Sequence, residues 1–342
     1  TAITLAVRVV APNLWGWFAD RLGRRMVVVR LGMVLALLFF LLVGLRTDFL
    51  WIAVTMTLFS FFWNACLAQF EANTLNHLGS GNNRYGLLRL WGSVGFIAVV
   101  AGGGLLLDHF GISLLLPMIS LLLLGGVFAS MVVPDHAGKK IHDQPAAFTD
   151  LIRQPRVVWF LLACLLMQMS HGPFYTFFSI HLESIGYPRS VVGYLWALGV
   201  VAEVGVFILL ARVMPRLGVD RVLIGSLFLA VVRWVLNGLF VDVLWVVIVA
   251  QLLHAATFGA FHVAAIARVH QLFSGRYQGR GQALFSSAGF GLGGALGGLY
   301  SGYAWEGVGP ANTYLLASSV AGVGLLVLLV PLMCKGGEPA DR

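Results

Sequence analysis

Residues 16–25 read GWFADRLGRR, a charged run that lies between two long apolar segments, residues 1–18 and 26–45. Its two glycines allow close approach of helices and a tight turn, and its aspartate can pair with an arginine near a helix N-terminus. Anchoring by positive charge alone accounts for the arginines, but not for an aspartate combined with two glycines. The residues to which we assign gating or structural roles are Gly16, Asp20, Arg21, Gly23, Arg24 and Arg25.

A weaker copy of this motif, ARVMPRLGVDR, occupies residues 211–221, and alignment of Arg21 with Arg216 gives an offset of 195 residues (216 − 21). GSVGF at residues 92–96 and SSAGF at residues 286–290 give an offset of 194 residues (286 − 92). Because two separate matches share nearly the same offset, we predict that the chain consists of two repeated halves.

The composition indicates a membrane protein. Apolar residues make up 59% of the 342 residues and charged residues only 11%, and the mean hydropathy of +0.89 is too high for a soluble surface. A spanning helix needs about 20 largely apolar residues, because lipid offers the backbone no hydrogen-bond partners. Runs such as residues 114–133 lack the alternating pattern of a β-barrel, so we predict an all-α fold. Eleven segments are long enough, near residues 1–18, 26–45, 49–72, 87–107, 112–133, 156–182, 190–213, 221–240, 243–267, 282–304 and 312–333.

The placement of the positive charges predicts the topology. The net charge is +8, and most arginines and lysines fall in loops on one side of the predicted helices, whereas Arg46 and Arg189 lie on the other side. By the positive-inside rule the richer side is cytoplasmic, which accounts for the charge without nucleic acid. Eleven crossings end inside, whereas two six-helix halves need twelve. We therefore expect that the first helix is missing and that the C-terminus is cytoplasmic.

No pattern typical of an enzyme stands out. The three cysteines, Cys66, Cys164 and Cys334, lie in or beside apolar segments and show neither a disulfide framework nor the spacing of metal ligands. The sequence also lacks a nucleotide-binding glycine loop and a nucleophile–base pattern. We therefore predict a protein that is not an enzyme and has no cofactor and no metal site.

Polar residues within apolar segments mark the candidate substrate site of the first half. Arg8 lies in an apolar setting where a charge is costly, so it should face protein or water. Ser60, Asn64 and Glu71 are spaced to share one helix face. Arg89 follows Glu71 by 18 residues (89 − 71), at the start of the next segment. Such a pair facing one cavity can hold a polar substrate, and an internal ion pair that neutralises itself is the alternative.

The second half carries polar residues on four apolar segments. Glu203 and Arg233 lie on neighbouring segments, and we expect them to pair. The histidines are either groups that titrate near neutral pH or satisfied hydrogen-bonding residues. Two segments place polar residues on one face, namely Gln168, His171, Tyr175 and Ser179 on the first and Gln251, His254, Phe258 and His262 on the second.

The motif at residues 16–25 resembles the G-x-x-x-D-x-x-G-R-R signature of the major facilitator superfamily. RLWGSVGF at residues 89–96, with the spacing from Glu71 to Arg89, resembles the branch that holds lactose permease and the 3-phenylpropionate permeases. The resemblance implies two pseudo-symmetric six-helix bundles, with eleven of the twelve helices present, and substrate-binding roles for Glu71 and Arg89. Phe96 stands where lactose permease has a tryptophan that stacks on its sugar, which counts against a sugar.

The proton-coupling residues of lactose permease are matched only in part. Its helix-8 glutamate matches Val200, so Glu203 lies one turn further along the same face. Its helix-9 arginine and helix-10 histidine match Arg233 and His254, but its proton-coupling glutamate corresponds to Thr257. Glu203 is therefore the main candidate for the proton carrier. The full set of candidate proton-coupling residues is Glu203, Arg233, His254 and His262.

We predict a proton-coupled symporter of the inner membrane that imports a small organic solute, an aromatic or other organic acid, by alternating access. The alternatives are an oligosaccharide or nucleoside proton symporter, an efflux antiporter and a transport-dead membrane sensor. The expected partners are the substrate, protons and the lipid bilayer, and we expect a monomer that binds no nucleic acid. The predicted domains are an N-terminal bundle at residues 1–133, a cytoplasmic linker at 134–155 and a C-terminal bundle at 156–342. The candidate substrate-binding residues are Glu71, Arg89, Asn64, Phe96, Arg8, His171, Tyr175, Gln251 and His254.

Overall fold

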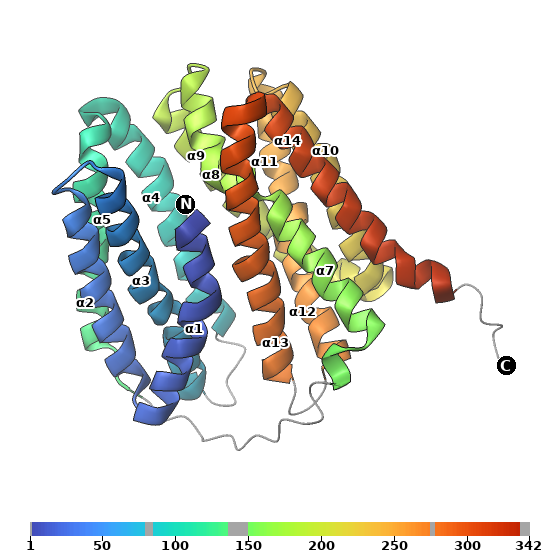
Figure 1. Ribbon diagram of the computed structural model, residues 1–342, viewed down its shortest axis with the longest axis horizontal. Helices are drawn as coiled ribbons and strands as arrows, with labels where there is room; N and C mark the ends of the chain where they lie inside the picture. Colours follow the sequence, from blue (N-terminus) through green and yellow to red (C-terminus); the bar gives the residue numbers. More distant parts are fainter. Residues whose placement is uncertain (1, 79–84, 136–149, 274–277, 336–342) are drawn as a thin grey trace. The chain divides into compact units, whose positions relative to one another are not determined.

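The computed structural model describes residues 2–78, 85–135, 150–273 and 278–335, and its regular structure in these ranges is helical (Figure 1). No strand occurs among these residues, which confirms the predicted all-α fold. The helices fall into two compact units, Ile3–Asp143 and Gln144–Arg342. Residues 136–149 of the predicted linker lie outside the described residues.

In the N-terminal unit, α2 packs against α3 and α5. Met26 and Val28 of α2 are fully buried and form a small apolar core with Ala65 and Cys66 of α3. The helices of this unit are α1 Ala2–Leu22, α2 Arg25–Val43, α3 Phe49–Leu78, α4 Tyr85–Phe110, the short 3₁₀-helix η2 Ile112–Leu114 and α5 Leu115–Val132.

Polar contacts tie together the helix ends of this unit. Arg30 of α2 donates from Nε to the carbonyl oxygen of Ser130 at 3.1 Å and from Nη2 to that of Val133 at 2.9 Å. These carbonyls belong to the end of α5, where the helix itself supplies no donor. In return, Asp135 Oδ1 accepts a hydrogen bond from the backbone nitrogen of Met26 in the first turn of α2, at 3.2 Å. The start of α2 and the end of α5 are therefore fastened to each other.

In the C-terminal unit, α14 packs against α7, α8 and α10, and the π-helix η3 packs against α9 and α10. Trp234 of α10 is fully buried and belongs to one large apolar core with Phe174 of α8 and Tyr314 of α14. The helices of this unit are α7 Pro155–Ser170, α8 Gly172–Ser184, α9 Arg189–Leu217, α10 Val219–Leu239, α11 Leu244–His254, η3 Ala255–Ala260, α12 Phe261–Leu272, α13 Gln278–Ser286, the π-helix η5 Ser287–Gly293 and α14 Gly294–Lys335.

Nine helical stretches among the described residues are long and apolar enough to cross a membrane, against the eleven segments predicted. The difference has two sources. The stretch Arg280–Val330 is counted once, but Gly309 interrupts its helical backbone with φ 82° and ψ 171°, so two of the predicted segments lie within it. The other source is α1, a helix of 21 residues that corresponds to the predicted segment 1–18 and is not among the nine.

The repeated motif places a glycine with a positive φ between two helices in each half. Gly23 connects α1 to α2 with φ 69°, and Gly218 connects α9 to α10 with φ 80°. Glycine adopts this left-handed region without the steric cost that a Cβ imposes. The two residues are 195 positions apart (218 − 23), the offset found by aligning the motifs. The repeat is therefore visible in backbone conformation as well as in sequence.

Three predicted segments are interrupted in their interior, one by a break and two by a π-helix. The predicted segment 156–182 is broken at His171, which lies between α7 and α8 with φ −79° and ψ −5°. Pro173 follows in the first turn of α8, where its missing N–H is tolerated. The predicted segments 243–267 and 282–304 contain the π-helices η3 and η5, which widen the helix by one residue per turn.

Candidate functional site

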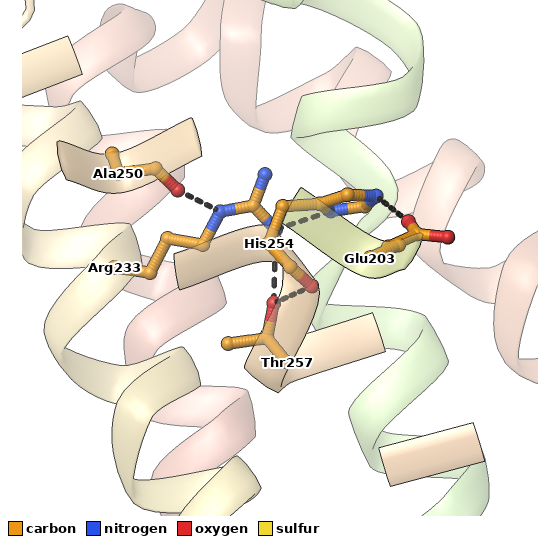
Figure 2. Close-up of polar contacts among 5 residues, drawn as sticks. All are labelled: Glu203, Arg233, Ala250, His254 and Thr257. Atoms are coloured by element: carbon orange, nitrogen blue, oxygen red, sulfur yellow. Dashed lines mark hydrogen bonds and ion pairs between the residues drawn. The ribbon is translucent and has the colours of Figure 1, made fainter. Parts of the chain in front are cut away.

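Three side chains from three helices meet inside the C-terminal unit: Glu203 on α9, Arg233 on α10 and His254 on α11 (Figure 2). His254 Nε2 lies 2.7 Å from Glu203 Oε1, and His254 Nδ1 lies 3.0 Å from Arg233 Nη1. Only 7% of the His254 side chain and 12% of the Glu203 side chain are exposed, and Arg233 is fully buried. The imidazole therefore bridges a guanidinium and a carboxylate in an environment shielded from solvent.

Donor and acceptor chemistry determines the direction of these hydrogen bonds. A guanidinium has only donors, so Arg233 Nη1 donates and His254 Nδ1 accepts. The single proton of a neutral imidazole then lies on Nε2, which donates to Glu203 Oε1. The arrangement fits a cationic arginine, a neutral histidine and an ionised glutamate, and hydrogen bonds to charged groups are stronger than neutral ones.

The expected pairing of Glu203 with Arg233 takes an indirect form in the described contacts. Both residues reach the same site, but the described contacts place His254 between them. The physical reason is the packing of α11 against both α9 and α10, which lets an imidazole fill the space between the two charges. Helical spacing predicts the face of each residue but not which neighbour reaches between them.

Arg233 is held by hydrogen bonds through Nε and Nη1 and by two aromatic rings, whereas its buried Nη2 has no hydrogen-bond partner among the described residues. Its Nε donates to the carbonyl oxygen of Ala250 at 2.9 Å, and its own carbonyl accepts from Asn237 Nδ2 at 3.0 Å. Its guanidinium carbon lies 4.3 Å from the ring centre of Phe174 and 4.5 Å from that of Trp234. Such cation–π contacts stabilise a desolvated guanidinium by about 2 kcal/mol. The sequence analysis did not identify these two aromatic residues, and the adjacency of Trp234 to Arg233 is the signal that points to one of them.

Thr257 is a third residue that the sequence analysis did not place in the site. Its Oγ1 accepts a hydrogen bond from Arg233 Nη1 at 3.1 Å (Figure 2). Thr257 lies in η3, and its hydroxyl can return its own hydrogen to the carbonyl oxygen of His254 at 3.4 Å. Thr257 aligns with the proton-coupling glutamate of lactose permease, and in this structure it is a direct hydrogen-bond partner of Arg233.

The polar residues predicted on segment 156–182 do not share one environment, because the helix breaks within that segment. Gln168 and His171 are buried, whereas Tyr175 is 46% exposed. His171 Nδ1 lies 2.8 Å from the carbonyl oxygen of Met167, so Nδ1 carries the hydrogen. The His171 ring packs edge-on against Trp234 at 4.8 Å and lies 6.4 Å from the ring of His254. His171 is thus a neighbour of the Glu203–His254–Arg233 cluster.

The residues predicted on one face of segment 243–267 do lie in a row. The rings of His254 and Phe258 stack at 5.3 Å, and those of Phe258 and His262 stack at 6.3 Å, with an interplanar angle of 9° in both pairs. Gln251 is fully buried one turn before His254. The row extends from His254 at the end of α11 through Phe258 in η3 to His262 in α12.

The candidate residues of the first half are only partly described. Asn64 Nδ2 donates within α3 to the carbonyl oxygen of Ser60 at 2.7 Å and lies 3.2 Å from its hydroxyl. Phe96 on α4 is 41% exposed, and Glu71 on α3 is half-buried. Arg8 lies in α1, Asp20 in α1 and Arg89 in α4, but their side chains lie outside the described residues. The predicted pairing of Glu71 with Arg89 therefore stays a prediction.

The signature motif makes contacts in the N-terminal unit. Arg25 Nη1 donates to Gln69 Oε1 of α3 at 2.8 Å, and the guanidinium of Arg21 lies 4.4 Å from the ring centre of Trp17. An added Cβ at Gly16 would lie 3.7 Å from the amide nitrogen of Gln69, which is an ordinary van der Waals contact. The predicted gating role of these residues stays a prediction.

Comparison with known proteins identifies the family. Residues 1–316 match the MFS_1 like family. The chain belongs to this family. It is 30% identical over 301 residues to the "Probable 3-phenylpropionic acid transporter" of Escherichia coli (strain K12), covering 86% of this chain and 78% of that protein. It is 26% identical over 332 residues to the "Maltose permease" of Geobacillus stearothermophilus, covering 95% of this chain and 82% of that protein.

The fold has a close counterpart among solved structures. The crystal structure of the nucleoside transporter NupG matches with a TM-score of 0.82 at 15% sequence identity, covering 97% of this chain and 89% of that chain. The predicted major facilitator fold, and the predicted branch that includes the phenylpropionate permeases, are confirmed. The protein is therefore a multi-pass membrane protein of a transporter family, and it is not an enzyme.

Proposed function

We propose that this MFS_1 like protein is a symporter that couples inward proton movement to the uptake of a small organic acid by alternating access. The observation that carries the proposal is the 2.7 Å contact between His254 Nε2 and Glu203 Oε1 inside the C-terminal unit. We further propose that the protein works as a monomer in the inner membrane with a cytoplasmic C-terminus.

Glu203 is our candidate for the proton carrier. A proton carrier must load on one side of the membrane and unload on the other, so its proton affinity has to differ between the two access states. Glu203 receives a charge-assisted hydrogen bond from His254 only while it is ionised. Protonation replaces that bond with a weaker neutral one, and it therefore loosens the contact between α9 and α11.

A charge count and the relatives support the proposed substrate class. The charged residues that we assign to the substrate and proton sites are three arginines and two glutamates, which gives a net charge of +1 (3 − 2). They are Arg8, Arg89, Arg233, Glu71 and Glu203. A substrate carboxylate would balance that charge, because an uncompensated charge in the membrane is costly. The relative at 30% identity is named as a probable 3-phenylpropionic acid transporter, which supports an aromatic acid. We assign its binding to Glu71, Arg89, Asn64, Phe96 and Arg8, with His171, Tyr175, Gln251 and His254.

The test is Glu203→Gln, which keeps the shape of the side chain and removes its titration. In proteoliposomes, we expect this variant to lose accumulation of radiolabelled 3-phenylpropionate driven by a pH difference. It should keep exchange of label between equal substrate pools on both sides, because exchange needs no net proton movement. Glu183→Gln is the matched control, since Glu183 is paired with Arg189 at 3.1 Å and is 37% exposed.

Accumulation against a gradient by Glu203→Gln would transfer the carrier role to another residue, with His254 next. Loss of exchange as well as accumulation would show that Glu203 binds substrate rather than carrying the proton. If wild-type protein does not transport or bind the acid at all, the proposed substrate class fails.

An oligosaccharide or nucleoside symporter is the second candidate, because a maltose permease is among the relatives at 26% identity. The same proteoliposomes distinguish the two. Uptake of maltose or uridine driven by a pH difference, with none of 3-phenylpropionate, would favour this candidate over an organic acid symporter.

A further inference from the structure

The buried guanidinium of Arg233 is anchored to one continuous helix at three points. Its Nε donates to the carbonyl oxygen of Ala250, and its Nη1 reaches both His254 Nδ1 at 3.0 Å and Thr257 Oγ1 at 3.1 Å. An Nη1 group carries two hydrogens, so these two acceptors use both of them. Because the guanidinium is planar, the two contacts together set its tilt about the Nε anchor.

The π-helix makes the double contact possible. Thr257 is the third residue of η3, which begins directly after His254, so the helix widens at the point where Arg233 approaches. The Thr257 oxygen accepts from Arg233 while its hydrogen faces the carbonyl oxygen of His254 at 3.4 Å. The hydroxyl is therefore oriented as an acceptor toward the arginine.

We propose that Thr257 is a positioning residue that keeps His254 in the tautomer with its hydrogen on Nε2, and that it thereby lowers the proton affinity of Glu203. While Arg233 donates to Nδ1, that nitrogen cannot carry a hydrogen, and Nε2 must donate toward Glu203. A protonated Glu203 can accept from Nε2 only through its carbonyl oxygen, in a neutral hydrogen bond that is weaker than the charge-assisted one. The hydrogen bond from Arg233 to His254 Nδ1 therefore favours the ionised carboxylate of Glu203 and assists release of its proton.

Loss of the Thr257 acceptor should relax this constraint. Arg233 would keep its Nε contact but could tilt away from Nδ1, and His254 could move its hydrogen to Nδ1. Nε2 would then accept from a protonated Glu203, which stabilises the protonated form. The charged and titratable groups facing His254 are Glu203 from α9, Arg233 from α10 and His171 from the α7–α8 junction. Because Arg233 is cationic, a neutral change of tautomer costs less than a second positive charge.

The first experiment measures the tautomer directly. Purified full-length protein with ¹⁵N-labelled histidine is examined by NMR across a pH titration, and the His254→Asn spectrum identifies the His254 signals. We expect hydrogen on Nε2 at high pH in the wild type and in Thr257→Ser, which keeps the hydroxyl. In Thr257→Val, which has the same shape without the acceptor, we expect the Nδ1 tautomer to appear as the pH falls. Thr257→Ala serves the same purpose if the valine variant does not fold.

Identical His254 signals in the wild type and in the variants without a hydroxyl would overturn the proposal. A shift that Thr257→Ser also shows would overturn it too, because the hydroxyl would then not be the cause.

The second experiment reads the consequence for transport, and this part rests on the proposed function. A tenfold rise in the proton affinity of Glu203, which is the size expected for one hydrogen bond, corresponds to about one pH unit. The external pH of half-maximal accumulation should therefore rise by about that amount in Thr257→Val and return to the wild-type value in Thr257→Ser. A tautomer change without any change in the transport profile would uphold the role of Thr257 on His254 and refute Glu203 as the carrier. An unchanged tautomer would refute the role of Thr257 whatever transport does.

Discussion

Replacement of Gly172 with alanine should strain a close contact between α8 and α14. An added Cβ at this first residue of α8 would lie 2.3 Å from the carbonyl oxygen of Gly297 in α14 and 2.4 Å from its carbonyl carbon. Ordinary Cβ contacts begin at 3.4 Å, so the two backbones would have to separate by about 1.1 Å (3.4 − 2.3). The obstructing atoms are backbone, and no side-chain rotation can relieve the overlap.

The cost can be worked out from this geometry. Overpacking typically costs about 1–3 kcal/mol, and a backbone obstacle places this substitution toward the upper end. Alanine also restricts the unfolded chain, which offsets about 0.4–1 kcal/mol. The net destabilisation is about 2 kcal/mol, which corresponds to a fall in Tm of roughly 4–8 °C for a unit of about 200 residues.

The assay follows the buried thiols during heating. With Cys334 replaced by serine, the remaining cysteines, Cys66 and Cys164, are both buried, and a thiol-reactive fluorescent dye reports their exposure. Gly302→Ala is the matched control on α14, because nothing lies within 4 Å of its added Cβ. Equal Tm values for Gly172→Ala and Gly302→Ala would refute the packing argument.

Two further predictions concern transport. Gly259→Ala places a Cβ 3.3 Å from Glu203 Cγ, so it should displace the carboxylate and reduce accumulation driven by a pH difference more than it reduces exchange. Gly225→Ala is the control, because its Cβ meets open space and should leave both rates unchanged. Equal losses of accumulation and exchange in Gly259→Ala would contradict the reasoning. Glu71→Gln and Arg89→Gln should each abolish binding of 3-phenylpropionate in a thermal-shift assay, because each removes one charge from the predicted substrate pair, and wild-type affinity in either variant would refute that pair.

Much of the fold could be predicted from the sequence, because long apolar runs leave helices as the only way to satisfy the backbone in lipid. The repeated glycine of the motif was also predictable, since a tight turn favours glycine and both Gly23 and Gly218 have a positive φ. The break at His171 had a local signal in the following Gly172–Pro173 pair. The π-helices η3 and η5 had no local signal of comparable strength, because one extra residue per turn hardly changes the spacing of apolar residues along a segment.

The candidate site was predictable as a set of residues but not as a network. Helical spacing and the resemblance to lactose permease selected Glu203, Arg233 and His254, and the three do meet. Their order could not be predicted, because it depends on how far each side chain reaches across the packed helices. Thr257 was hidden for a different reason: a hydroxyl in an apolar helix usually bonds to its own backbone, and only the tertiary structure shows the arginine beside it.

The surroundings of Trp234 also make this residue an optical sensor within the protein. Its ring is fully buried, has the Arg233 guanidinium at 4.5 Å and the His171 imidazole at 4.8 Å, and donates through Nε1 to Ser170 at 3.1 Å. Indole emission responds to nearby charge and to collisions with a protonated imidazole. Any movement of Arg233 or gain of charge on His171 should therefore change the wavelength and intensity of the fluorescence emitted by Trp234. The difference spectrum between the wild type and Trp234→Phe would isolate that signal without an attached label.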